Sequence, residues 1–247
     1  GTNAVLHLAA LVHQMNGAEK SEYKRINVGQ NLSLAKKAKE SGVGHFVFMS
    51  SIKVYGEEAD TPYTENSPCS PEDDYSISKL MAENELLAMR SDDFRVTIVR
   101  TPIVYGEGVK GNIKSLISLV RKLRVIPLGN TDNMRSMVYI GNLCHLVNTT
   151  LANKTEGIFL AGDDRPVSTS EFISLIAKNL GKKVYLIKIP LFETALKILK
   201  PSFHKRLYGN LQIDNTLTKS AVGFTNPYSV EEGIMSMIDG EKDDKIF

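Results

Sequence analysis

The sequence predicts an α/β protein with a doubly wound parallel sheet and a smaller α/β lobe interleaved with it. Short apolar segments at 4–8, 45–49 and 95–100 alternate with segments of helical length. Runs of this kind are typical of strands buried on both faces of a parallel sheet. Right-handed crossovers between such strands place helices on both faces, which gives the doubly wound arrangement.

The order of elements follows from the same pattern. The predicted elements of the first part are a strand over 4–8, a helix over 19–40, a strand over 45–49, a loop over 61–74, a helix over 74–89 and a strand over 95–100. The rhythm then becomes looser, with a helix over 112–123, short strands over 125–126 and 137–139, a helix over 141–151 and a strand over 184–189.

Two helix starts carry the spacing of a capping box. Ser168 precedes Glu171 by three residues, and Ser229 precedes Glu232 by three, which predicts helices over 169–180 and 230–238. We therefore expect one domain over 1–104 and about 131–160, a second lobe over about 105–130 and 161–240, and a frayed tail over 241–247.

Composition narrows the class of partner. The 247 residues are 42% apolar and 23% charged, as in a globular protein, and 30 Lys and Arg against 28 Asp and Glu give a net charge of +2. This balance provides no bulk field for nucleic acid or an anionic membrane and favours a small-molecule partner. No apolar run reaches the roughly 20 residues of a membrane span. Cys69 and Cys144, distant and without a CxxC pattern, indicate a reducing, cytoplasmic location.

A tyrosine and a lysine provide the first sign of chemistry. Tyr75 and Lys79 are four residues apart on a predicted helix and so share one face. An ammonium beside a phenol lowers the tyrosine pKa from about 10 and makes the group a proton acceptor. An exposed contact without function is the alternative reading of such a pair. Ser51 follows the strand over 45–49, where ligands bind in open α/β sheets, and is placed to bond the same substrate oxygen.

Further segments give these residues a context: 7–10, Asn27 with Val28, Arg100 followed by 104–106, and 135–139. Together they resemble the extended short-chain dehydrogenase/reductase family, in particular its NAD-dependent epimerase/dehydratase branch, of the bacterial polysaccharide-biosynthesis type. The resemblance runs from Ala4 to the last helix. It implies a partial Rossmann-like dinucleotide-binding domain and a substrate-binding lobe.

The resemblance also implies residue roles. Ser51, Tyr75 and Lys79 would be catalytic: Tyr75 takes the proton of a sugar hydroxyl, Lys79 holds the nicotinamide ribose, and Ser51 orients the sugar oxygen. The positions implied to line the cofactor are Leu8, Ala9, Ala10, Tyr75, Lys79, Thr101, Pro102 and Ile103. Those implied to contact substrate are Ser51, His13, Asn112 and Arg135. Arg206, in the basic segment between Leu191 and Leu211, is a further candidate for the diphosphate, since the planar fork of an arginine suits phosphate. A loop histidine, a helix cap and a surface ion pair are the alternatives for His13, Asn112 and Arg135. No metal is expected.

The sequence departs from the family pattern in four places. Ile103 stands where relatives usually have asparagine, and Gln30-Asn31 replaces the usual Gly-Thr. Ile52-Lys53 replaces the Asp-Glu pair of 4,6-dehydratases, which argues against dehydration. The opening strand with GxxGxxG and its following acidic residue, roughly 60 residues in all, is absent, so we expect a fragment of a longer protein. A cut-down relative that does not hold NAD normally is the alternative.

The expected function is that of an NAD-dependent epimerase on a UDP-hexose or UDP-N-acetylhexosamine, acting through a 4-keto intermediate. A nucleotide-sugar 4-ketoreductase or dehydrogenase and a non-catalytic binding or scaffold relative are the alternatives. NADP is less expected than NAD, although the acidic residue that discriminates them is outside this chain. Relatives commonly pair through the helices that here cover 19–40 and 74–89, so a homodimer is expected. The fragment by itself is not assured of enzymatic activity.

One segment has two interpretations. Between Leu191 and Leu211 basic residues interleave with apolar ones. This is the composition of a helix on a membrane surface. Pro201 interrupts the segment, which favours a helix of the substrate lobe instead.

Overall fold

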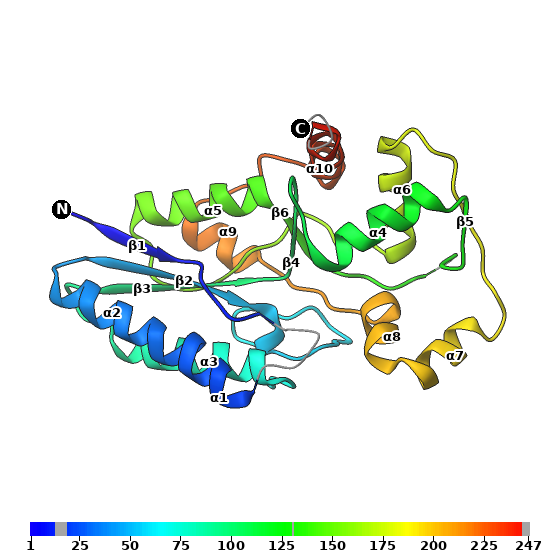
Figure 1. Ribbon diagram of the computed structural model, residues 1–247. Helices are drawn as coiled ribbons and strands as arrows, with labels where there is room; N and C mark the ends of the chain where they lie inside the picture. The colour runs from blue at the N-terminus through cyan, green and yellow to red at the C-terminus, as the bar shows by residue number, and fades with distance from the viewer. Residues whose placement is uncertain (13–18, 130, 244–247) are drawn as a thin grey trace.

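A four-stranded parallel sheet forms the centre of the molecule in the computed structural model, which describes residues 1–12, 19–129 and 131–243. The strand order is β1-β2-β3-β7 (Figure 1). The strands are β1 (Ala4–His7), β2 (His45–Ser51), β3 (Arg95–Thr101) and β7 (Gly157–Leu160). Ser51 pairs in register with Thr101, so β2 and β3 end together at one edge. The predicted parallel α/β sheet is confirmed, and β7 is an additional strand that the sequence pattern did not reveal.

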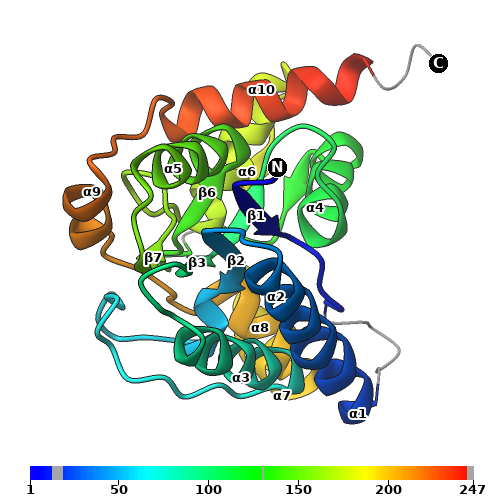
Figure 2. The same ribbon diagram turned by 90° about the vertical axis from the view of Figure 1, so that its left-hand side faces the viewer.

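Helices cover both faces of this sheet. On one face, α1 (Lys20–Tyr23), the π-helix η1 (Lys24–Gln30) and α2 (Asn31–Glu40) run on continuously beside α3 (Asp74–Ala88) (Figure 2). Ala35, Ala82 and Leu86 are buried there against Phe46 and Phe48. The opposite face carries α5 (Ile140–Asn153) and α9 (Thr216–Val222). The helix predicted over 19–40 is present, with a π-helical segment in its middle.

The second lobe has its own core. It contains α4 (Gly111–Lys122), α6 (Thr169–Asn179) and α10 (Val230–Asp243), which pack together through Ile117, Ile173 and Ile234. Two small parallel pairs complete it: β4 (Ile103–Tyr105) with β6 (Met137–Tyr139), and β5 (Val125–Ile126) with β8 (Tyr185–Leu186). The helices α7 (Phe192–Leu199) and α8 (Pro201–Tyr208) project from this lobe at the lower right of Figure 1.

Both predicted helix caps form. The amide of Glu171 donates to Ser168 Oγ at 3.0 Å, and the amide of Ser229 donates to Glu232 Oε2 at 2.8 Å. The helix after Ser229 extends to Asp243, beyond the predicted end at 238 and into the expected tail. Once a helix is anchored, each further residue adds a hydrogen bond at little cost.

The strand predicted over 184–189 is reduced to Tyr185–Leu186, because its partner β5 offers only two residues for pairing. Within the described ranges, no helix has both the length and the apolar character that crossing a bilayer requires.

Candidate active site

Ser51 and Tyr75 meet at the carboxyl edge of the sheet. Ser51 is the last residue of β2 and is buried, and Tyr75 lies in the first turn of α3. The Ser51 hydroxyl is close enough to the phenol to lower its pKa. Lys79 lies one turn further along α3, with its ammonium 3.9 Å from the centroid of the Phe48 ring. The structure therefore gathers the three residues that the sequence singled out as catalytic.

The start of α3 is held by Asp73. The Ser76 amide donates to Asp73 Oδ1 at 2.7 Å, and the Asp73 amide donates to Ser76 Oγ at 3.2 Å, which completes a capping box. Lys53 donates to Asp73 Oδ2 at 2.6 Å and pairs with Glu57 at 2.5 Å. Lys53, which stands where 4,6-dehydratases have an acidic residue, thus fixes the start of the helix that presents Tyr75.

A buried ion pair fixes the same helix at its middle. Arg100 Nη2 of β3 donates to Glu83 Oε2 of α3 at 2.6 Å, and Ser50 of β2 donates to Glu83 Oε1. Both charged side chains are almost fully buried. Because Tyr75, Lys79 and Glu83 are spaced four apart, anchoring Glu83 to the sheet turns the other two toward it as well.

The electrostatics differ from the sequence prediction. Burial raises the pKa of Tyr75 to about 12; the Asp73 carboxylate adds to the rise and the hydrogen bond with Ser51 opposes it. The prediction of a lowered pKa is wrong for this structure, because burial of the phenol dominates its pKa. Lys79 is not among the groups that act on this pKa, and its ammonium lies over the Phe48 ring. Burial also lowers the pKa of Lys79 to about 8. At neutral pH, Tyr75 is a neutral phenol and Lys79 retains its proton.

The residues expected beside the cofactor lie at the same edge. Leu8 and Ala9 are exposed directly after β1, with Ala10 next to them. Thr101 ends β3 and donates to the Ser50 carbonyl at 3.0 Å, and Pro102 behind it is buried. Ile103 follows and is exposed.

These residues suit a dinucleotide. The Lys79 ammonium has no hydrogen-bond acceptor among the described residues, so its N–H groups are available to ribose hydroxyls. Leu8 and Ile103 provide exposed apolar surface for a flat ring at the same edge. An apolar surface with a few convergent polar groups is the usual character of a cofactor site.

Asn27 is a site-supporting residue that we did not predict as such. Its Oδ1 accepts from the Leu11 amide at 2.7 Å, and its Nδ2 donates to the Leu11 carbonyl at 3.0 Å and to Ser78 Oγ at 3.0 Å. The side chain thereby ties the segment after β1 to α3, between Tyr75 and Lys79. The signal was present in the Asn27-Val28 motif, and its location in a π-helix is typical of functional positions.

Two arginines lie near one another, Arg135 just before β6 and Arg206 in α8. Arg135 Nη1 donates to the carbonyls of Lys205 and Gly209 at 3.3 and 3.1 Å, at the end of α8. Burial lowers the pKa of Arg135, and the nearby Arg206 guanidinium lowers it further against the opposing effect of two glutamates. Within the part of the chain that the structure describes, neither arginine has a carboxylate at ion-pair distance. Such a pair suits a diphosphate.

The structure does not bring the other described residues predicted to contact substrate together with the two arginines. Asn112 is exposed in the first turn of α4 and shares no hydrogen bond with either arginine among the described residues. His13 lies outside the described residues. No group of three or more metal-ligating side chains occurs in the described ranges.

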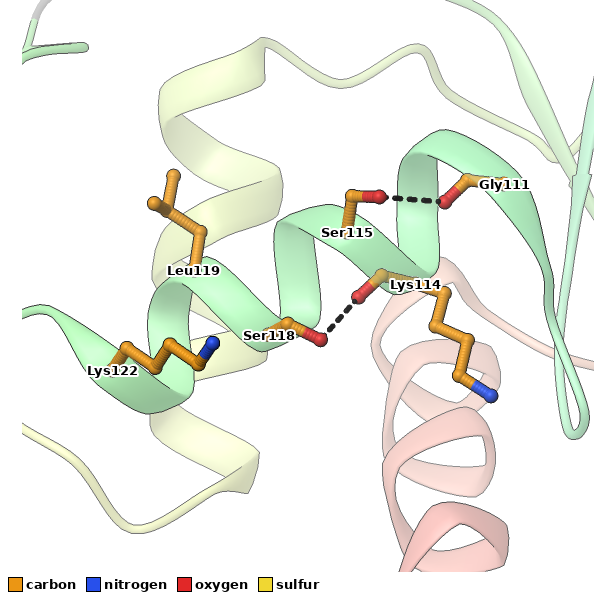
Figure 3. A pocket seen from close by; sticks show the side chains of 6 residues that line it. All are labelled: Gly111, Lys114, Ser115, Ser118, Leu119 and Lys122. Carbon is orange, nitrogen blue, oxygen red and sulfur yellow. Dashed lines mark hydrogen bonds between the residues drawn. The ribbon is translucent and has the colours of Figure 1, made fainter.

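A surface hollow on the outer face of α4 is separate from this edge (Figure 3). Its serines already bond their own helix: Ser115 donates to the Gly111 carbonyl at 3.1 Å and Ser118 to the Lys114 carbonyl at 3.0 Å. None of the three candidate catalytic residues lines it, so it carries no argument about the reaction.

Comparisons with known proteins agree with this geometry. The sequence model of the NAD dependent epimerase/dehydratase family matches residues 1–162. The chain is 38% identical over 246 residues to a UDP-glucose 4-epimerase of Vibrio cholerae, with 94% of this chain and 74% of the relative covered. It is 25% identical over 272 residues to the N-acetyl-alpha-D-glucosaminyl-diphospho-ditrans,octacis-undecaprenol 4-epimerase of Escherichia coli O157:H7, covering 100% and 81% of the two chains.

A solved structure shares the fold. The UDP-glucuronic acid 4-epimerase from Bacillus cereus, in complex with NAD, superimposes with a TM-score of 0.77 at 20% identity, covering 98% of this chain and 74% of that one. With its Ser51, Tyr75 and Lys79 at the carboxyl edge of a parallel sheet and the family model matched over residues 1–162, the chain belongs to the NAD-dependent epimerase/dehydratase family.

Proposed function

We propose that this chain carries the reactive part of an NAD-dependent nucleotide-sugar 4-epimerase whose substrate is a UDP-hexose or UDP-N-acetylhexosamine. The observation that carries the proposal is the juxtaposition of Ser51, the buried last residue of β2, with Tyr75 in the first turn of α3 and Lys79 one helical turn further on. The 38% identity to a UDP-glucose 4-epimerase supports the choice of reaction and of substrate class.

Each residue has a role in this proposal. Ser51 donates a hydrogen bond to the sugar oxygen. Tyr75 accepts the proton of that hydroxyl as the phenolate during oxidation, becomes the neutral phenol, and returns the proton during reduction. Because the pKa of Tyr75 is about 12, the phenol must first lose its own proton, and the phenolate requires positive charge nearby at the moment of reaction. Lys79 keeps its proton at neutral pH and is the protein's cation for this purpose. The nicotinamide supplies the hydride acceptor when it is bound.

The substrate is held from the second lobe. Arg135 and Arg206 bind the diphosphate. Asn112, exposed in the first turn of α4, stays a separate candidate for a substrate contact. The residues at the carboxyl ends of β1 and β3 line the cofactor.

The proposal includes a reducing cytoplasmic setting, which the two free cysteines Cys69 and Cys144 favour, and a homodimer.

The test is turnover of UDP-sugars by the complete protein with NAD. We expect UDP-glucose or UDP-N-acetylglucosamine to give its 4-epimer, without net change in the absorbance of reduced nicotinamide. Stoichiometric cofactor turnover would instead indicate the ketoreductase, and binding without any product the non-catalytic relative.

A variant pair identifies the proton acceptor. Tyr75→Phe should lower the rate by about 10²- to 10⁴-fold, the usual contribution of general base catalysis, with unchanged circular dichroism. Tyr185→Phe is the matched control, because Tyr185 is an exposed tyrosine of β8. Retained activity in Tyr75→Phe would remove this residue from its proposed role.

A further inference from the structure

The segment that contains α7 and α8 concentrates the positive charge of the chain. Residues 182–206 contain seven Lys and Arg against a single acidic residue, Glu193. The rest of the chain contains 23 basic and 27 acidic residues and is therefore net negative. The net charge of the whole chain is close to zero, although this one segment is strongly cationic.

The same element exposes large apolar side chains. Leu191, Ile198 and Leu199 have 80%, 74% and 78% of their surface exposed, and Phe203 of α8 is also exposed. Leu191 lies directly before α7, and Ile198 and Leu199 are the last two residues of that helix. Neither α7 nor α8 contains a buried residue. The hairpin is instead attached to the lobe through partly buried residues, namely Phe192, Leu207 and Tyr208.

One of these exposed residues has an unusual backbone conformation. Leu191 has φ +64°, in the left-handed region that leucine rarely adopts. Burial of its side chain does not compensate for this conformation, since most of its surface is in solvent. Strained conformations of this kind are concentrated at functional positions, which argues that the exposed apolar face has a use.

The lysines around this face are uncompensated. Lys188, Lys197 and Lys200 are exposed and form no ion pair with the residues that the structure describes. The single acidic residue, Glu193, already accepts from His204 at 3.3 Å. Exposed leucine, isoleucine and phenylalanine combined with free lysines are the chemistry of a helix that lies in a membrane interface. The ammonium groups meet anionic headgroups, and the apolar side chains enter the boundary of the acyl chains.

A second copy of this chain is a poor occupant. A two-fold interface through this face would bring two equally cationic segments against each other. We propose that the face formed by Leu191, Ile198, Leu199 and Phe203, with Lys188, Lys197 and Lys200, docks on an anionic phospholipid membrane. The interaction is peripheral, through a hairpin that the fold already holds in a helical conformation (Figure 1). It does not depend on the reaction proposed above.

Vesicle flotation of the purified full chain tests the proposal. We expect the chain to float with vesicles of phosphatidylethanolamine and phosphatidylglycerol and to remain in the dense fraction with phosphatidylcholine alone. The double variant Lys188→Glu with Lys197→Glu should lower the partition coefficient on anionic vesicles by about tenfold or more, as expected for the loss of two basic residues at a charged surface. The double variant Ile198→Ser with Leu199→Ser should also lower the partition coefficient on the same anionic vesicles at the same salt concentration.

A control variant carries the same kinds of substitution at exposed positions outside α7 and α8. Leu217→Ser with Lys122→Glu changes an exposed leucine of α9 and an exposed lysine of α4 and should leave flotation unchanged. All variants should keep the circular dichroism of the parent chain, and turnover of a soluble UDP-sugar should not respond to the hairpin variants. Failure of the parent chain to float, or equal flotation of the lysine variant, would overturn the proposal. So would a change of mass in light scattering caused by Ile198→Ser with Leu199→Ser without any change in flotation, which would assign the face to contacts between copies.

Discussion

Replacement of Lys79 by methionine should make the protein more stable while removing its activity. Lys79 is 2% exposed, and burial lowers its pKa from 10.5 to about 8. At pH 7 this lowering corresponds to about 3 kcal/mol by which the charged side chain destabilises the fold. The contact with the Phe48 ring returns about 1 kcal/mol. Lys79→Met, of similar length and without the charge, should therefore raise the free energy of unfolding by about 2 kcal/mol.

Urea unfolding followed by circular dichroism measures this difference. Because the folded pKa lies below the unfolded one, the unfolded chain holds more protons between pH 8 and 10.5, and the stability of the parent protein should rise over that window. The advantage of Lys79→Met should shrink over the same window. Lys36→Met is the control, since Lys36 is an exposed lysine of α2, and it should change stability by less than about 0.5 kcal/mol. A Lys79→Met protein no more stable than its parent at pH 7 would refute the reasoning.

Two further predictions concern the framework. Glu83→Gln leaves the Arg100 guanidinium buried without its carboxylate, so the free energy of unfolding should fall by about 3–5 kcal/mol; Glu85→Gln, at an exposed position of the same helix, should have little effect in the same urea titration. Light scattering at micromolar concentration should give twice the chain mass of 27.3 kDa if the helices over 19–40 and 74–89 pair two copies, and a monomer mass would contradict the homodimer.

Local pattern was sufficient for much of the site. Tyr75 and Lys79 could be placed on one helix face because residues four apart in a helix lie one turn apart on the same side. Ser51 could be placed at the end of a strand because the apolar run before it ends there. The caps at Ser168 and Ser229 were also predictable, since each bond joins residues three apart.

The supports of the site were not predictable in this way. Glu83 and Arg100 are separated by 17 positions, and Asn27 and Ser78 by 51, so only the packing of α3 against the sheet brings them together. The strand β7 was missed because four residues that follow a helix carry too little periodicity, and its identity depends on pairing with β3.

The sequence by itself determined the alternation of strands and helices, the family resemblance and the identity of the three candidate catalytic residues, because these depend on composition and on spacing along the chain. Only the tertiary structure decided the direction of the Tyr75 pKa, the ring on which the Lys79 ammonium rests and the exposure of the α7 face. The physical reason is that desolvation, charge proximity and burial depend on which distant segments cover a side chain, and neighbours in sequence do not specify that cover.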